Sequence, residues 1–239
     1  MARASTTRLF SRGVADPSGL RAFVRDRSGT VLALDLRTGE MLWRAARGLR
    51  ALAVVDDMLV AARVAAPSAL EIVILDTAEG RVRRVSERLP LPSWVLPSLD
   101  DTSEFTLRAE PEGRSVVIWW SAQARYQGGA PPSTKVRETF ERDAHGAARV
   151  DLDTGAVELL PESTDVTDHS VGQPATSTAE PNVLEQQELG DKRFQLVADT
   201  QAGGAIKVFV RAVDRASGKM VWETLIEEAP QYRPKRLRP

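Results

Sequence analysis

Short apolar runs alternate with polar turns along the chain, and one turn pattern recurs between them. In residues 29–43, the aliphatic run 31–34 leads into Asp35-Leu36-Arg37-Thr38-Gly39, and a second apolar run starts directly afterwards. The aspartate carboxylate can accept the backbone N–H two residues on, and glycine can adopt the left-handed conformation that the returning strand requires. The pattern therefore predicts a β-hairpin.

We assign to one repeat four of the places where an aspartate is followed four positions later by a glycine. These are Asp35 with Gly39, Asp76 with Gly80, Asp151 with Gly155, and Asp214 with Gly218. An apolar or β-branched run precedes each copy, as expected for a strand. Four positions after the glycine, the first and last copies have Trp43 and Trp222, whereas the middle copies have Arg84 and Leu159. The middle copies are therefore degenerate versions of one repeat.

The spacing of the copies indicates the architecture. Asp35 and Asp76 are about 40 residues apart, which is the period of one four-stranded propeller blade. The two later intervals are longer, and each contains an insertion. Because a single blade cannot bury both of its faces, such blades must stack around an axis. The sequence predicts an all-β fold: a small β-propeller of about four four-stranded antiparallel blades, as one domain over residues 1–239.

The repeat resembles that of PQQ-like, quinoprotein-type β-propellers. Residues 29–43, GTVLALDLRTGEMLW, match that repeat closely, residues 208–222 match it fairly well, and the central copies match mainly through aspartate and glycine. The resemblance implies that Trp43 and Trp222 dock between neighbouring blades as core residues. Most members of the family have seven or eight blades. Four blades could close as a small ring, which we favour, or pair with a second copy into a larger one.

Two insertions and a tail lie outside the blade pattern. Within residues 124–147, the run 133–145 is predicted to be a helix, with a Ser or Thr cap and a glycine after its end. Residues 161–191 are polar and acidic, and we expect them to form a flexible loop. Residues 229–239 are predicted to be a basic, extended tail.

Three strand assignments complete the sequence-based picture. Residues 6–14 are predicted to be a strand that either completes the first blade or seals the ring against the last blade. Residues 115–121 form a continuous apolar run, and we expect this strand to be the most buried one. The fourth blade is expected over residues 194–226.

Composition narrows the classes of function. The formal net charge of −1 creates no field that would draw the whole chain to nucleic acid or an anionic membrane. The lack of cysteine excludes disulfides, thiolate metal sites and cysteine nucleophiles. No apolar run approaches the about 20 residues of a membrane span, and residues 1–20 lack the apolar segment of an export signal. We therefore expect a cytoplasmic protein, from a bacterium, that does not bind membranes.

Candidate chemistry is sparse. In the family that the repeat resembles, quinone binding implies calcium ligands that include asparagine and usually a pair of adjacent cysteines, but the chain has a single asparagine, Asn182. Asp165, Asp168 and His169 have metal-binding side chains, but they lie in the acidic insertion. His145 is expected at the end of the predicted helix, where it would complement the helix dipole. We therefore predict no catalytic, cofactor-binding or metal-binding residues and no enzymatic activity.

Our leading hypothesis is a non-enzymatic scaffold or protein-interaction subunit of a larger cytoplasmic assembly, because propellers present loops on a stiff framework. The candidate partner-binding residues lie in the tail and the predicted helix: Arg233, Lys235, Arg236, Arg238, Lys135 and Arg142. The alternative is a ligand-binding or hydrolytic propeller with a site at the mouth of the central channel. A third hypothesis, which we do not favour, is nucleic-acid binding through the tail. Formation of a homodimer is a further alternative that the sequence does not decide.

Overall fold

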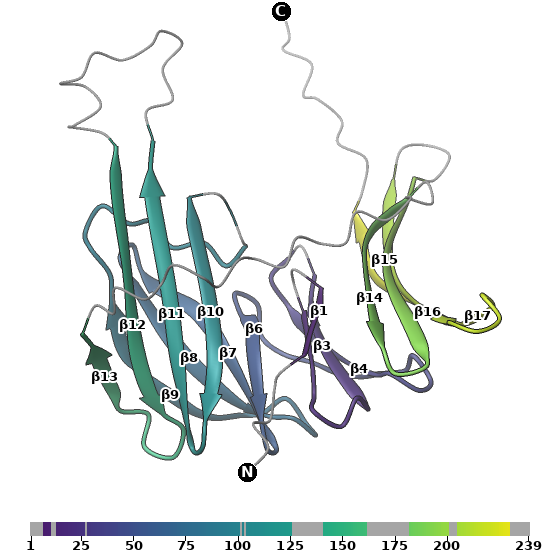
Figure 1. The fold of residues 1–239 in the computed structure, drawn as a ribbon, viewed down its shortest axis with the longest axis horizontal. Helices are drawn as coiled ribbons and strands as arrows, with labels where there is room; N and C mark the ends of the chain where they lie inside the picture. The colour runs from purple at the N-terminus through teal and green to yellow at the C-terminus, as the bar shows by residue number, and fades with distance from the viewer. Residues whose placement is uncertain are drawn as a thin grey trace, which may run out of the picture.

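The structure, a computed structural model, describes residues 7–10, 13–26, 28–100, 102, 104–125, 141–161, 182–200 and 205–229. Every regular element in these ranges is a β-strand, and the strands form four antiparallel sheets (Figure 1). In each sheet the strands are hydrogen-bonded in the order in which they follow one another in the sequence. This is the meander of a propeller blade, so the predicted all-β class and blade architecture are confirmed.

The first sheet has five strands and the other three have four strands each. The first sheet contains β1 (Thr7–Phe10), β2 (Gly13–Ala15), β3 (Arg21–Arg25), β4 (Val31–Asp35) and β5 (Met41–Arg44). The second contains β6 (Arg50–Val55), β7 (Met58–Ala66), β8 (Ala69–Asp76) and β9 (Val82–Pro90). The third contains β10 (Phe105–Glu112), β11 (Ser115–Ala124), β12 (Arg142–Asp151) and β13 (Val157–Leu160). The fourth contains β14 (Val183–Leu189), β15 (Lys192–Thr200), β16 (Ile206–Asp214) and β17 (Met220–Ala229).

The sheets are arranged around a common centre in the order fourth, first, second, third. Their first strands lie innermost, where β14 contacts β1, β2 contacts β6, and β6 contacts β10. In Figure 1 the third sheet lies on the left and the fourth on the right, with the first sheet between them. The last sheet of the chain therefore packs against the first one.

Three hydrophobic cores hold neighbouring sheets together. One joins the fourth and first sheets, one joins the first and second, and the largest joins the second and third. The strand β4 is continuously apolar because both of its faces are covered. Leu32 and Leu34 face the fourth sheet, while Val31 and Ala33 face the second. A strand with both faces covered needs apolar residues at every position.

Among the described residues, none of these cores joins the third sheet to the fourth. The described sheets therefore form an open arc, and the closed four-blade ring that we favoured is not formed. Neighbouring sheets touch at their inner strands, as β6 and β10 do, and also at their outer strands, as β9 and β13 do.

The segment before β3 fulfils both roles that the sequence left open. β2 pairs with β3 and completes the first sheet, while β1 pairs with β2 and also contacts β14 of the last sheet. Leu9 and Phe10 of β1 are buried in the core between the fourth and first sheets. This short strand therefore belongs to one sheet and helps to hold another.

The structure corrects the predicted end of the inserted helix. Residues 142–145 belong to β12, which pairs with β11 along its whole length, from Asp151 opposite Ser115 to Arg142 opposite Ala124. The local helix signals are overridden there because β11 lies opposite every one of these residues in an antiparallel ladder. The rest of the predicted helix, residues 133–140, lies outside the described residues.

Two further expectations change. Part of the expected loop 161–191 is strand β14, the first strand of the fourth sheet, which that sheet uses in addition to residues 194–226. The strand β14 was not recognised from the sequence because its side chains are exposed or half-buried.

The strand β11 is not the most buried strand, since β6 is buried at all six positions. β6 has a sheet on each side, whereas in the described part of the chain the third sheet has a hydrophobic core on one face.

Candidate interaction surface

The four Asp-x-x-x-Gly turns share one local structure. In the first, the Asp35 carboxylate accepts hydrogen bonds from the backbone N–H groups of Arg37 at 2.8 Å and Thr38 at 2.9 Å. The Gly39 N–H donates to the Asp35 carbonyl at 2.8 Å, and its φ of 78° lies in the left-handed region. These backbone donors hold the pKa of Asp35 below its ordinary value of 3.8.

The other three turns repeat these bonds. Asp76, Asp151 and Asp214 each accept backbone N–H groups from the residues that follow, and their glycines have φ values of 70°, 81° and 66°. The pKa of each carboxyl is lowered. The main cause is the Arg83 guanidinium for Asp76, the Thr154 backbone N–H for Asp151, and the Ser217 hydroxyl for Asp214.

Trp43 and Trp222 each dock on the turn of the neighbouring sheet. The indole Nε1 of Trp43, on β5, donates to the Thr77 carbonyl of the second sheet at 3.0 Å. A Cβ added to Gly80 would lie 2.5 Å from the Trp43 ring. Glycine is therefore required there for close approach as well as for its positive φ.

The junction between the fourth and first sheets has the same geometry. Trp222 Nε1, on β17, donates to the Leu36 carbonyl at 3.1 Å, and a Cβ on Gly39 would lie 2.6 Å from the Trp222 ring. The Thr224 hydroxyl also donates to the Gly39 carbonyl. In both junctions, a residue on the outer strand of one sheet covers the turn of the next.

Arg84 replaces tryptophan at the junction between the second and third sheets. Its guanidinium donates to the Thr154 carbonyl at 3.3 Å, and a Cβ on Gly155 would lie 3.2 Å from its Cδ. Sequence reasoning treated this copy as degenerate and missed the docking role. The signal was nevertheless present, since Arg84 stands four positions after its glycine, as Trp43 does.

The third sheet differs from the other three at the equivalent position. Leu159 stands four positions after Gly155, on the outer strand β13, but it lies opposite Ala148, which belongs to the core between the second and third sheets. The outer strands of the other sheets have an irregularity that turns Trp43, Arg84 and Trp222 toward the next sheet, and the described pairing of β12 with β13 has none. At the Asp214 turn of the fourth sheet, a Cβ on Gly218 would have no neighbour within 4 Å among the described residues.

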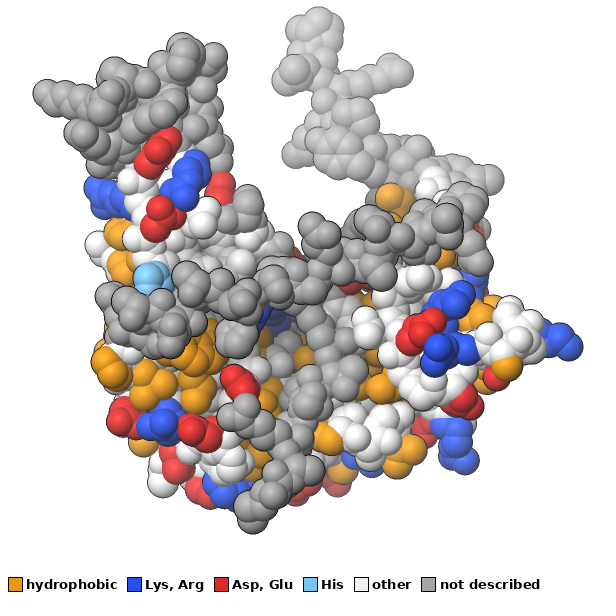
Figure 2. All heavy atoms as spheres, in the orientation of Figure 1, with side chains coloured by type: hydrophobic (Ala, Val, Ile, Leu, Met, Phe, Trp, Pro, Cys, Tyr) orange, Lys and Arg blue, Asp and Glu red, His pale blue; other side chains and the backbone are white. Residues whose placement is uncertain are grey.

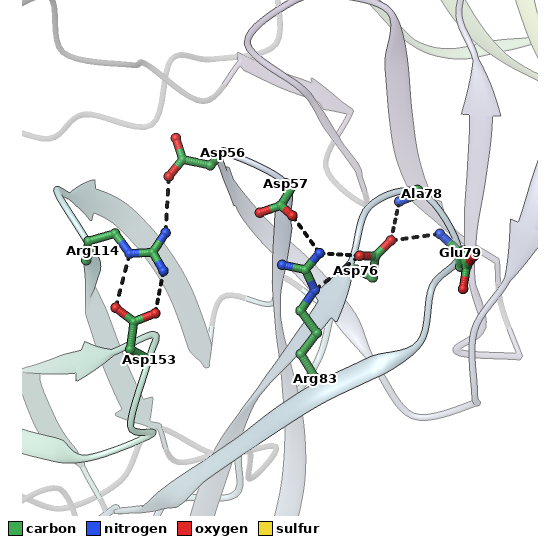
Figure 3. Close-up of polar contacts among 8 residues, drawn as sticks. All are labelled: Asp56, Asp57, Asp76, Ala78, Glu79, Arg83, Arg114 and Asp153. Atoms are coloured by element: carbon green, nitrogen blue, oxygen red, sulfur yellow. Dashed lines mark hydrogen bonds and ion pairs between the residues drawn. The ribbon is translucent and has the colours of Figure 1, made fainter.

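Ion pairs line the edge of the second and third sheets where the hairpin turns lie (Figure 3). Arg83 pairs with Asp76 and, at 2.6 Å, with Asp57. Arg114 pairs with Asp153 and, at 3.5 Å, with Asp56. The guanidinium groups lower the pKa of Asp57 and Asp153, and the carboxylates raise the pKa of both arginines. Arg114 thereby links the turn at Asp153 to the turn at Asp56, and Arg83 links the turns at Asp76 and Asp57.

The fourth sheet has a partly apolar face on the side away from the first sheet. The strand register places four apolar residues in one row across this face: Val183, Val197, Phe209 and Leu225. The first three line an open hollow of about 200 Å³, together with Asn182, Asp199, Arg211 and Glu223. Val197 is buried, Phe209 is half-buried, and Leu225 is 39% exposed.

The hollow has the chemistry of a contact surface. Arg211 and Glu223 pair across it at 2.8 Å, and its other lining groups are apolar apart from one amide and one carboxylate. Its volume is below the roughly 300 Å³ at which small-molecule pockets begin. In the ranges that the structure describes, no three His, Cys, Asp or Glu residues come together as metal ligands do.

Of the partner-binding residues proposed from sequence, the structure describes Arg142 alone, which lies on β12 of the third sheet. Arg142 is exposed at the start of β12, where its carbonyl accepts a bond from Arg125 at 3.4 Å. Lys135 and the tail residues Arg233, Lys235, Arg236 and Arg238 lie outside the described residues. Sequence reasoning missed Phe209, although the alternation around it along β16 could have marked it as part of a second apolar face.

No helix in the described part of the chain has the length and apolarity needed to cross a membrane.

A family model described as "Outer membrane protein assembly factor BamB" matches residues 4–88, which include the first two sheets. Residues 4–88 carry the PQQ-like propeller repeat. The resemblance seen in the sequence is therefore confirmed. A search of curated protein sequences gives no match.

Several solved structures are similar in part. BamB from Moraxella catarrhalis is 19% identical, with 88% of this chain and 59% of that chain covered and a TM-score of 0.29. The quinohemoprotein alcohol dehydrogenase ADHIIG from Pseudomonas putida HK5 is 15% identical, with 87% and 33% covered and a TM-score of 0.32. The WD40 domain of SCAP from fission yeast is 10% identical, with 86% and 53% covered and a TM-score of 0.23. The chain thus spans less than two thirds of each of these structures.

Proposed function

We propose that this PQQ-like propeller is a non-enzymatic scaffold, a protein-interaction subunit of a larger assembly in the cytoplasm. The observation that carries this proposal is the free face of the fourth sheet. Its row of apolar side chains lies beside an ion pair, and such a mixture is typical of protein contact surfaces.

The outer strand of the same sheet extends the surface. Met220, Val221 and Leu225 of β17 are 59%, 48% and 39% exposed. Apolar side chains gathered on one exposed strand mark an interaction site more often than scattered ones do. A flat face with a shallow hollow suits the side chains of a protein partner better than a small substrate.

The family description supports the same kind of role, because the matching model is described as an assembly factor. The cytoplasmic location is proposed from composition and sequence alone. Cell fractionation with an antibody against the native protein tests it, and recovery in a membrane fraction would reject that part of the proposal.

The test of the interaction role is Phe209→Glu. A carboxylate in the centre of the apolar row must be desolvated when a partner covers it, so we expect capture of partner proteins to weaken by roughly 30-fold or more. The matched control is Val82→Glu, which places the same charge on the outer strand β9 at a side chain that is 55% exposed.

Binding is measured by quantitative affinity capture from native extract, with circular dichroism to show that both variants fold. Equal capture by Phe209→Glu, Val82→Glu and the unaltered chain would reject the fourth-sheet face as the contact surface.

A further inference from the structure

We propose that the free face of the fourth sheet binds an extended acidic peptide segment of another protein, with a carboxylate at Arg193 and an apolar side chain in the hollow beside Phe209. This rests on the proposed function, since it names the class of partner that this face accepts. The peptide lies along β15, where the alternate residues Arg193, Gln195 and Val197 share this face of the sheet.

The first step of the argument is that this face differs from the faces on which sheets pack. Arg193, Gln195 and Arg211 occupy positions where the other three sheets have buried apolar residues. The equivalents of Arg211, three residues before the turn aspartate, are Leu32, Val73 and Ala148. Opposite these, the equivalents of Gln195 are Val24, Ala61 and Ile118. The equivalents of Arg193, on the same strands, are Ala22, Leu59 and Val116.

An apolar sheet packed on the fourth one would take these three polar side chains out of water without pairing them, which costs free energy. A partner with polar groups of its own fits this face better. The occupant is therefore not a sheet of the kind that packs at the other junctions, and a peptide, whose backbone is polar, meets the requirement.

The second step is that two polar atoms on this face are buried without a hydrogen-bond partner among the described residues. They are Oε1 of Gln195, a residue that is 3% exposed, and Nε of Arg193. A peptide group has both an N–H and a C=O, so it complements the guanidinium and also the carboxamide in either orientation. Gln195 lies opposite Gln186 and Arg211, and these long side chains can turn aside for a peptide without movement of the backbone.

The third step is the charge at the Arg193 end of the face. Glu188 pairs with Arg193 at 3.5 Å and with Arg215 at 2.9 Å, so two guanidinium groups share one carboxylate. Figure 2 shows basic and acidic side chains together over the fourth sheet on the right, whereas hydrophobic side chains gather over the third sheet on the left. An acidic residue of a peptide would supply a second carboxylate to the two arginines.

The fourth step is the position of the hollow. It lies next to Gln195 along β15, and Val183, Val197 and Phe209 form its apolar part. Its volume of about 200 Å³ suits one side chain of a peptide. Side chains on one side of an extended chain recur every two residues, about 7 Å apart, which is also the spacing of alternate residues in β15. The site therefore selects a peptide in which an acidic residue and an apolar residue are four positions apart, as Arg193 and Val197 are.

The first experiment selects a ligand without knowledge of the native partner. Random linear peptides displayed on phage are selected on the full-length chain. We expect enrichment of sequences with Asp or Glu four positions from Leu, Ile, Met or Phe. No enrichment, or enrichment of peptides without an acidic residue, would overturn the proposal.

The second experiment uses the selected peptide, labelled with a fluorophore, in anisotropy titrations. Arg193→Gln removes the charge, so we expect it to weaken binding by roughly tenfold and to reduce the dependence of the dissociation constant on salt. The matched control is Arg149→Gln on the third sheet, because the Arg149 side chain is also 38% exposed and also pairs with a carboxylate. Equal losses in these two variants would show non-specific attraction and would overturn the proposal.

Gln195→Leu separates binding from structure. It removes the buried carboxamide, so we expect a higher melting temperature, and it also removes a hydrogen-bond partner of the peptide, so we expect binding to weaken by roughly fivefold. Circular dichroism measures the melting temperature of each variant. Unchanged peptide binding by Gln195→Leu would overturn the proposal.

The outcomes separate this inference from the proposed function. If Phe209→Glu loses the native partner but Arg193→Gln and Gln195→Leu capture it as well as the unaltered chain, the scaffold role stands and the peptide site is wrong. A second copy on this face, seen as a doubled mass that Phe209→Glu abolishes, would also overturn the peptide site. If Phe209→Glu changes neither peptide binding nor capture, the scaffold role itself fails.

Discussion

At the residue scale, one glycine per turn decides how closely two sheets can approach. Gly39 and Gly80 lie beneath tryptophan rings, and a side chain at either position would clash with the ring. Gly218 has nearly the same φ as Gly80, 66° against 70°, but has no described neighbour in that direction. Substitutions at Gly80 and Gly218 therefore separate two losses in the free energy of unfolding. One comes from backbone strain, and the other comes from lost docking of the tryptophan.

We therefore expect Gly80→Ala to destabilise the chain more than Gly218→Ala. Both substitutions cost about 1 kcal/mol because alanine is strained at positive φ. Gly80→Ala must also displace Trp43, which adds about 1–3 kcal/mol of overpacking. Urea unfolding, at concentrations where the chain is monomeric, gives both free energies of unfolding. Equal losses at the two positions would contradict the docking role of Gly80.

The turn aspartates predict how stability depends on pH. The pKa of Asp35 is lower in the folded chain than its ordinary value of 3.8. A lowered folded pKa contributes stability that is complete above the unfolded pKa and is lost as pH falls through the folded value. We expect Asp35→Asn to reduce the loss of stability below about pH 4, because asparagine keeps an acceptor oxygen but does not titrate.

Thermal unfolding from pH 7 down to pH 3 measures this effect. The idea fails if Asp35→Asn leaves the slope of melting temperature against pH unchanged.

At the scale of elements, sequence predicted the hairpins well and the insertions poorly. The aspartate, the glycine and the preceding apolar run are local signals, and each of them fixed a turn and the strand before it. β14 was missed because its seven residues have no fully buried side chain, so no alternation marks it. The start of β12 was predicted to be helical because local capping signals do not report the partner strand β11. Backbone pairing decided both cases, with β11 for the start of β12 and with β15 for β14.

The short strand β1 gives a prediction at this scale. Leu9 is 1% exposed in the core between the first and fourth sheets. We expect Leu9→Ala to reduce the free energy of unfolding by about 2–5 kcal/mol, as other buried Leu→Ala substitutions do. Leu20→Ala, at a leucine that is 59% exposed in the same sheet, is the control and should change it by less than about 0.5 kcal/mol. Chemical denaturation monitored by tryptophan fluorescence measures both, and similar losses would show that β1 is not docked.

At the scale of the whole molecule, the number of sheets could be predicted but their closure could not. Each repeat has its own Asp-x-x-x-Gly turn, so the four turns predicted the four sheets that the structure contains. Closure depends instead on the angle between neighbours, which is set by how side chains fill the space between two whole faces.

The packing of the last sheet on the first also affects how the chain acquires its structure. The bond from Trp222 to Leu36 joins residues 186 positions apart. Contacts of such long range slow folding because a large loop must close before they form. On the ribosome, one face of the first sheet would remain bare until nearly the whole chain has emerged. We therefore expect nascent chains to depend on chaperones until β17 is made.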